Sequence, residues 1–333
     1  MALSELSSNK EQYGAATEQG HCVVIAGPGS GKTKTLTTAM ARALMDDITD
    51  PRGVACITFN NECAAELEER LSCFSIACSE RNFIGTVHSF ALNQVLIPYS
   101  RCIPGLLPND FRVATRDECR AAVEAAYLAK FGAIGDPHTR WKFAEEKRRR
   151  DVNRLLPSWR SNNPELADFI ELYEAHLRRS GLIDFDDMPL IAFRMLREHD
   201  WICNGIRSRY PVLFVDEYQD LGHALHELVL LLCFDAGIRL FAVGDADQSI
   251  YGFNGANPRL LDSLVSRADV KTFRLRFNYR SGAKIIRASM GALGEERNYR
   301  GPDGTAEGEI GFHGVEGDYE KQARYIAQDL IPS

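Results

Sequence analysis

The chain has 333 residues, of which 45% are apolar and 26% charged, a composition typical of a globular protein with room for two or three domains. No apolar run approaches the length of a membrane span, the N-terminus does not resemble a secretory signal, and nine cysteines without a CxxC pair suggest reduced thiols, so we expect a cytoplasmic protein. The net charge of −7 argues mildly against a polyanionic partner, unless basic residues gather locally.

Four short apolar runs, each bounded by turn signals, predict buried strands. They lie at residues 21–27, 54–59, 211–217 and 239–245. Helical periodicity follows the first run at Leu36, Met40 and Leu44, and the third run is followed by a helical stretch that ends near Gly237. Strands that alternate with helices predict an α/β fold with a parallel sheet covered on both faces.

The middle of the chain, from about residue 90 to 190, has helical periodicity and no evident buried strand. Thr115 and Glu118 form a capping-box pattern that opens a helix running to Gly132. Pro164 opens another helix, which ends at Gly181. Because the sheet signals resume after residue 205, we predict an α/β domain interrupted by an all-helical insertion.

The last part of the chain predicts a helix over 281–293, a strand over 308–314 and a final helix over 319–330. About 55 residues make a poor core for an α/β layer. We therefore expect this part to be the start of another domain.

The sequence AGPGSGKT at residues 26–33 lies between a predicted strand and an amphipathic helix, the context that a phosphate-binding loop requires. Its glycines let backbone N–H groups converge on phosphate oxygens at a helix N-terminus. We expect Lys32 to reach the β- and γ-phosphates and Thr33 to ligate Mg²⁺. The flanking elements disfavour a glycine-rich turn without a ligand, although Ala26 replaces the first glycine of the general pattern GxxxxGK[ST]. The predicted nucleotide-binding residues of the loop are Ala26, Gly27, Pro28, Gly29, Ser30, Gly31, Lys32, Thr33 and Lys34.

A second motif, VDEYQD at residues 215–220, places two adjacent carboxylates at the end of an apolar strand. Asp216 suits the coordination shell of Mg²⁺, and Glu217 suits the positioning and deprotonation of an attacking water. The alternative is a solvated acidic turn, which the apolar strand and the phosphate loop make a poorer interpretation.

Together with GDADQSIYGFNGA (244–256) and NYRS (278–281), this motif resembles the UvrD/Rep/PcrA group of superfamily 1 DNA helicases. TFNNECAAEL (58–67), GTVHSF (85–90) and DFDDM (184–188) also occur in the family's order, so the resemblance spans nearly the whole chain. Most of these motifs are weak singly, but six in this order form a strong signal.

The resemblance implies a domain organisation. It consists of a RecA-like P-loop ATP-binding domain (1A) over 1–90 and 190–278, a helical insertion (1B) over 91–189, and the truncated beginning of a second RecA-like domain (2A) over 279–333.

The resemblance also implies roles at the nucleotide. Gln12 matches a glutamine that reads the adenine edge, although an ordinary surface residue is a strong alternative. Gln248 matches a sensor of the γ-phosphate, Tyr279 an aromatic that stacks on adenine, and Arg280 an arginine that neutralises charge at the γ-phosphate. The expected catalytic set is Lys32, Asp216, Glu217, Gln248 and Arg280.

A strand-binding track is implied in the same way, because hydroxyls and amides can hold phosphates and aromatic rings can stack on unpaired bases. Its expected members are Thr58, Phe59, Asn61, Thr86, His88, Tyr251 and Phe253. For each aromatic alone, burial in the core would be the better interpretation, but their grouping beside the nucleotide motifs favours binding. Glu62 and Phe253 stand where the family commonly has Lys and Trp, which suggests altered affinity for DNA.

Basic residues gather in two segments. Residues 140–154 hold seven Lys or Arg against three acids, and residues 267–287 hold seven against one. The first segment lies in the helical insertion, where family members contact DNA, and a solvated helix face is an equal alternative.

These observations predict an ATP- and Mg²⁺-dependent translocase or helicase that acts on single-stranded DNA and at ss/dsDNA junctions. The resemblance to the family implies movement from 3′ to 5′. The alternative is a nucleotide- and ssDNA-binding fragment without motor activity, completed by a missing second motor domain or a partner subunit. A P-loop ATPase of another kind would leave TFNN, GTVHS and DQSIY unexplained.

Overall fold

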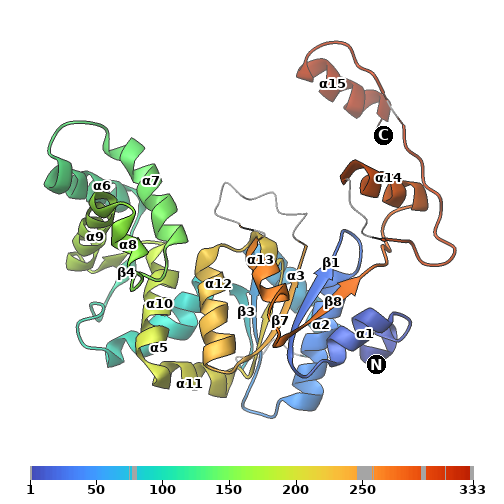
Figure 1. Cartoon of the computed structure of the whole chain (residues 1–333), viewed down its shortest axis with the longest axis horizontal. Coiled ribbons are helices and arrows are strands. Elements are labelled where there is room, and N and C mark those ends of the chain that lie inside the picture. The colour runs from blue at the N-terminus through green and yellow to red at the C-terminus, as the bar shows by residue number, and fades with distance from the viewer. Residues whose placement is uncertain are drawn as a thin grey trace. The chain divides into compact units, whose positions relative to one another are not determined.

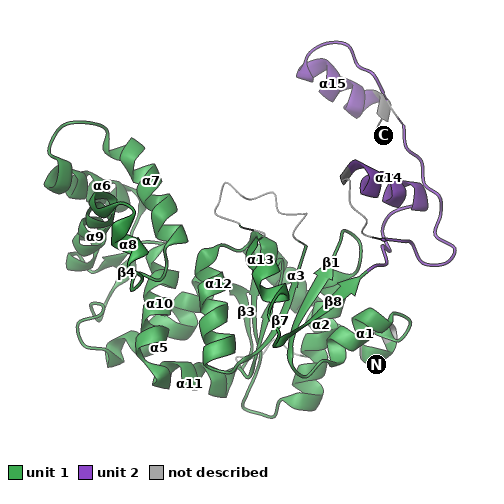
Figure 2. Ribbon diagram, viewed as in Figure 1, with its two compact units in different colours: residues 1–275 green, residues 276–333 purple. Residues whose placement is uncertain are grey.

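The computed structural model describes residues 2–74, 76, 81–245, 257, 259–293, 298–311 and 313–330. They belong to two compact units, residues 1–275 and 276–333 (Figure 2). Within the described ranges, no helix combines the length and apolar character needed to cross a membrane.

A parallel sheet of six strands forms the centre of the first unit, in the order β3-β2-β6-β7-β1-β8 (Figure 1). The strands are β1 (His21–Ala26), β2 (Ala55–Thr58), β3 (Phe83–Thr86), β6 (Val212–Val215), β7 (Arg239–Gly244) and β8 (Val270–Leu275). The predicted α/β class with a parallel sheet is confirmed, and all four predicted strands are present. Because the strands are parallel, their carboxyl ends meet at one edge of the sheet, where ligands bind in folds of this kind.

Helices cover both faces of this sheet, and successive strand residues point to opposite faces. Val23 packs in the core formed with α10, α11, α12 and α13, whereas Val24 packs in the core formed with α1, α2 and α3. The helices of the first unit are α1 (Lys10–Thr17), α2 (Lys32–Arg42), α3 (Asn61–Ser72), α4 (Val87–Phe90), α5 (Ile97–Tyr99), α6 (Arg116–Phe131), α7 (Pro137–Arg150), α8 (Ser158–Ser161), α9 (Pro164–Arg179), α10 (Asp187–Glu198), α11 (Asp200–Arg209), α12 (His223–Val229) and α13 (Arg259–Val265).

The helical segment between β3 and β6 has a hydrophobic core of its own, built by α6, α7, α8 and α9. The predicted capping box is present, because Thr115 accepts a hydrogen bond from the backbone N–H of Glu118 while the Glu118 carboxylate accepts one from Thr115 N. Two strands of two residues each, β4 (Arg112–Val113) and β5 (Leu182–Ile183), pair beside these helices. The division of the chain into domains 1A, 1B and 2A stays a prediction.

The basic segment 140–154 is only in part the solvated helix face that was one of its two interpretations, since Lys142, Arg149 and Arg150 are exposed. Its contact with DNA stays a prediction. Lys147 and Arg148 are buried on α7. Arg148 reaches Glu174 through Nε (3.1 Å), Asp184 through Nη1 (2.6 Å) and Asp187 through Nη2 (2.9 Å). Since these carboxylates come from α9, the end of β5 and α10, this part of the basic segment joins helices together.

The second unit contains α14 (Ala283–Leu293) and α15 (Tyr319–Tyr325), the latter continued by a π-helical turn over Ile326–Leu330. Both predicted helices are therefore present. The predicted strand over 308–314 is wrong: the described residues of this stretch form no strand. Its glycines weaken the preference for extended structure, and the described part of the unit offers no partner strand.

Candidate nucleotide and strand-binding site

The phosphate loop connects β1 to α2 at the carboxyl edge of the sheet. Gly29 and Gly31 have φ values of 69° and 83°, which favour glycine, and the Ser30 hydroxyl closes the turn by donating to the carbonyl oxygen of Gly27 (2.6 Å). Lys32 is the first residue of α2. The loop thus presents backbone N–H groups at the positive end of the helix dipole, which is a site for phosphate.

Gln12 is buried against this loop. Asn9 caps α1 by accepting hydrogen bonds from the backbone N–H groups of Glu11 and Gln12, which fixes the helix start. Gln12 Nε2 then donates to the carbonyl oxygen of Ser30 (3.1 Å), and only 4% of Gln12 is exposed. The interpretation of Gln12 as an ordinary surface residue is therefore wrong, and its role in reading adenine stays a prediction.

The acidic pair follows β6 at the same edge. Asp216 is buried, and its backbone N–H donates to the carbonyl oxygen of Ile57 on β2 (2.9 Å). Burial and the neighbouring Glu217 carboxylate raise the pKa of Asp216 to about 7. Glu217 has a left-handed backbone (φ 47°), a conformation that costs energy for a residue with a side chain and is often found at functional sites.

The phosphate loop and the acidic pair meet across β7, which lies between β1 and β6 in the sheet. Lys32 Nζ lies 3.6 Å from Glu217 Oε2, and both side chains are largely shielded from solvent. The predicted catalytic residues Lys32, Asp216 and Glu217 are thus brought to one edge, although the two motifs are far apart in the sequence.

The residues present suit Mg²⁺. A buried carboxylate with a raised pKa, as at Asp216, gains when a cation replaces its proton. No group of three or more His, Cys, Asp or Glu that could hold a metal occurs within the described ranges. Mg²⁺ needs no such group, because it commonly takes one or two protein oxygens, phosphate oxygens and waters. Thr33 and Asp216 are the side chains that would supply the protein oxygens.

The predicted strand-binding residues of β2 and β3 lie at the carboxyl edge with different exposure. Thr58 is completely buried, Phe59 is half-buried against the core, and Asn61 is exposed at the start of α3. Thr86 caps α4 by accepting a hydrogen bond from Ser89 N (3.2 Å). Their contacts with DNA stay predictions.

His88 belongs to an aromatic pair that sequence reasoning missed. Its ring stacks on that of Phe185 (3.8 Å between centroids, 23° between planes), and Phe185 is 57% exposed. Burial lowers the pKa of His88 to about 4, so the ring is neutral at physiological pH. An exposed ring backed by another ring can stack on an unpaired base. The only sequence signal was an aromatic residue between the aspartates of DFDDM.

Other predicted residues lie elsewhere. Gln248, Tyr251 and Phe253 are outside the described residues. Tyr279 and Arg280 belong to the second unit, where Asn278 Oδ1 accepts hydrogen bonds from the backbone N–H groups of Arg280 and Ser281 (2.9 Å each) and shapes the turn before α14. Their roles at the nucleotide stay predictions.

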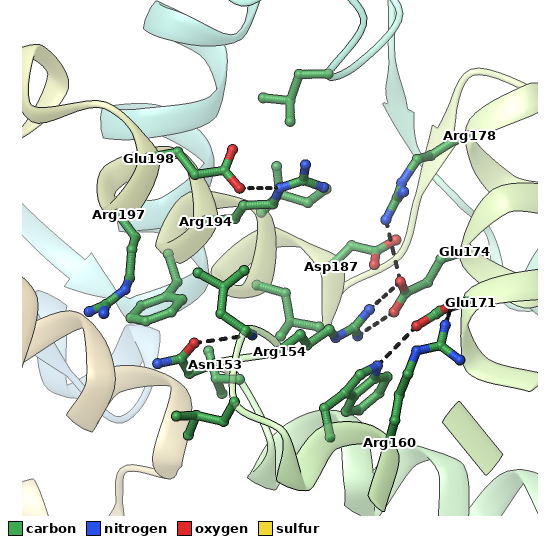
Figure 3. Close-up of a pocket in the computed structure, with 18 of the residues that line it drawn as sticks. Asn153, Arg154, Arg160, Glu171, Glu174, Arg178, Asp187, Arg194, Arg197 and Glu198 are labelled. Atoms are coloured by element: carbon green, nitrogen blue, oxygen red, sulfur yellow. Dashed lines mark hydrogen bonds and ion pairs between the residues drawn. The ribbon is translucent and has the colours of Figure 1, made fainter. Parts of the chain in front are cut away.

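A cavity of about 630 Å³ lies away from these residues, between α8, α9, α10 and the loop before α8. Figure 3 shows Arg154 and Arg178 pointing at Glu174, and Arg160 pointing at Glu171. None of the residues predicted to bind nucleotide or DNA lines this cavity. Four of its arginines, Arg154, Arg160, Arg178 and Arg194, form ion pairs with glutamates of the same lining, so it belongs to the packing of the helical segment.

A parallel sheet with a phosphate loop after β1 and a carboxylate pair after β6 defines the class of P-loop nucleotide-binding proteins. Within that class, residues 8–269 match the UvrD/REP helicase N-terminal domain, and the chain belongs to this family.

Bacterial proteins named as DNA helicases are among the relatives of this chain. The chain is 25% identical to DNA helicase II of Haemophilus influenzae (99% of this chain, 47% of the relative), 28% identical to DNA helicase II of Escherichia coli (90% and 41%), and 29% identical to the ATP-dependent DNA helicase Rep of E. coli (81% and 40%). The chain spans less than half the length of these curated relatives.

Proposed function

We propose that the chain is the ATP-binding and strand-binding part of a DNA translocase or helicase that hydrolyses ATP with Mg²⁺. The observation that carries this proposal is the meeting of Lys32 and Glu217 at the carboxyl edge (3.6 Å), beside the buried Asp216. A family whose relatives are named ATP-dependent DNA helicases supports the same function.

The chain's own residues can perform most of the hydrolysis. The loop amides and the Lys32 ammonium bind and orient the phosphates. Glu217 accepts a proton from the water whose oxygen attacks the γ-phosphorus, while the bond to the bridging oxygen breaks and ADP leaves. Mg²⁺, when bound by Thr33 and Asp216, neutralises charge on the phosphate oxygens.

Two substitutions test the catalytic assignment. Lys32→Ala is expected to abolish both tight ATP binding and hydrolysis, because the loop loses its phosphate-binding cation. Glu217→Gln is expected to retain ATP binding and to lower hydrolysis by about a hundredfold or more, since an amide cannot accept the proton. Lys271→Ala, at an exposed lysine on β8, is the matched control and should keep wild-type rates. Wild-type turnover in both site variants would contradict the assignment.

The strand-binding part of the proposal places single-stranded DNA along the carboxyl ends of β2 and β3. The exposed Asn61 and the His88–Phe185 pair support this path. Phe185→Ala is expected to weaken binding of a fluorescent oligonucleotide by about five- to a hundredfold, since one base–aromatic stack contributes ~1–3 kcal/mol. Trp201→Ala, at a partly exposed aromatic residue on α11, serves as the control. Equal affinities for all three proteins would refute the path.

A second candidate is a nucleotide- and ssDNA-binding module without motor activity. Hydrolysis stimulated by ssDNA, together with strand displacement, supports the motor. Binding of both ligands without turnover supports the module. Blocked oligonucleotides of opposite polarity test the proposed 3′ to 5′ movement.

A further inference from the structure

Gln219 lies in the short turn that follows Glu217, and only 1% of it is exposed. We propose that Gln219 is a positioning residue that holds the Glu217 carboxylate in place and ties it to the carboxyl end of β7. This inference rests on the proposed ATP hydrolysis and adds a residue to its machinery.

The amide nitrogen of Gln219 serves the acidic side of the site. Nε2 donates to Glu217 Oε2 (2.9 Å) and to Asp220 Oδ2 (3.2 Å). An amide has two such hydrogens, so these bonds occupy both donors. A reversed amide would place its oxygen against two carboxylate oxygens, which fixes the orientation chemically.

The amide oxygen of Gln219 serves the neighbouring strand. Oε1 accepts a hydrogen bond from the backbone N–H of Asp245 (2.9 Å), the residue directly after β7. Gly244 makes this approach sterically allowed, because a Cβ there would lie 2.8 Å from Gln219 Oε1. One buried side chain therefore links the ends of β6 and β7.

The Glu217 carboxylate needs such support. The torsion that orients a carboxylate has only weak preferences, and the backbone of Glu217 is in a left-handed conformation outside the strand. Gln219 and Lys32 both contact Oε2. No hydrogen bond to Oε1 is formed by any residue that the structure describes, so Oε1 is the oxygen that can accept the water's proton. A carboxylate held by one oxygen and reactive at the other is a positioned base.

Gln219→Met tests the role, because it keeps the side-chain size and removes the hydrogen bonds to Glu217, Asp220 and Asp245 described above. With a saturating concentration of single-stranded DNA, kcat for ATP hydrolysis is expected to fall about 10- to 100-fold, as for other supporting partners of a reactive group. KM for ATP and the affinity for a fluorescent ATP analogue should change less than about twofold, since Gln219 does not contact the phosphate loop. Gln94→Met, whose Oε1 accepts from Tyr210 OH, is the matched control and should leave kcat unchanged.

Gln219→Glu separates positioning from a merely structural role. This variant keeps the side-chain size and an acceptor for Asp245 N, but it replaces the donor to Glu217 and Asp220 by a third carboxylate. Repulsion between the carboxylates displaces Glu217, so kcat of Gln219→Glu is expected to fall at least as far as that of Gln219→Met, with KM for ATP within about twofold of wild type.

An unchanged kcat in a folded Gln219→Met variant, or a loss confined to KM, would overturn the positioning role while leaving the proposed function standing. A Gln219→Glu variant that keeps the wild-type kcat would also overturn it. Absence of hydrolysis in the wild-type chain would overturn the inference together with the proposed function.

Discussion

Gly31 shows how one residue can serve both the backbone and a neighbouring helix. Its φ of 83° belongs to the left-handed region, and an added Cβ would lie 2.6 Å from Gln12 Nε2. Gly31→Ala is expected to lower the affinity for ATP by at least tenfold, because the strain of about 1–2 kcal/mol and the contact with Gln12 both distort the loop. Titration with a fluorescent ATP analogue measures this effect.

A second glycine with positive φ shows what strain alone does away from the site. Gly132, at the end of α6, has a φ of 73° but a ψ of −160°, against 34° at Gly31, and an added Cβ there would meet open space. Gly132→Ala should therefore reduce stability through backbone strain and leave the affinity for ATP unchanged. Equal affinities of Gly31→Ala and wild type would show that the loop tolerates a side chain.

At the level of elements, Arg148 makes the helical segment depend on a buried ion cluster. Arg148→Met removes the cation from three buried carboxylates and is expected to cost roughly 3–5 kcal/mol in the free energy of unfolding. Arg150 lies two residues further along α7, and about half of its side chain is exposed. Arg150→Met should therefore cost at most about 1 kcal/mol in the free energy of unfolding. Urea unfolding measures both, and similar losses in the two variants would contradict a structural role for the cluster.

The pairing of Tyr218 with His226 on α12 makes stability depend on pH. Tyr218 OH lies 2.8 Å from His226 Nδ1, and burial, with His223 and Arg267 nearby, lowers the pKa of His226 from 6.5 to about 4. The folded state favours the neutral ring of His226. The stability that this ring contributes is therefore complete above the unfolded pKa of 6.5 and is lost as the pH falls from about 6.5 toward 4.

A substitution isolates this contribution. His226→Gln keeps an acceptor for Tyr218 and does not titrate. Between pH 7 and 5, the free energy of unfolding should therefore fall by about 1–2 kcal/mol more in wild type than in His226→Gln. The same pH dependence of the free energy of unfolding in wild type and His226→Gln between pH 7 and 5 would exclude the effect.

Of the six strands of the central sheet, the two that sequence reasoning missed are the edge strands β3 and β8. The residues of β3 alternate between buried and partly exposed, and β8 is buried only at its first and last residues, so neither reads as an apolar run. The four interior strands were recognisable because both of their faces are covered. The motifs predicted Lys32 and Glu217 in one site, whereas the contacts of Gln12, Gln219 and Phe185 depend on the order of strands, which local patterns do not contain.

At the scale of the whole molecule, the two units differ in the number of residues that they bury. Among the described residues of 276–330, only Asn278 and Ile286 are buried. Hydrogen exchange is therefore expected to be slowest in the central strands β1 and β7 and fast in α14 and α15, because local opening there exposes little apolar surface. Mass spectrometry of peptides after brief labelling measures this difference. Protection of α15 equal to that of β1 would contradict it.

The position of β6 in the sheet has a consequence for how the chain folds. Ala55 on β2 pairs with Phe83 on β3 and with Leu213 on β6. The pairing of β2 with β6 closes a loop that contains the entire helical segment. Pairings that close long loops are entropically costly and slow. Because α6 to α9 have a core of their own, local helical contacts can shorten that loop before the strands meet. The helical segment would then fold early and bring β6 close to β2. The carboxylates after β6 would reach the phosphate loop only after the helical segment has formed.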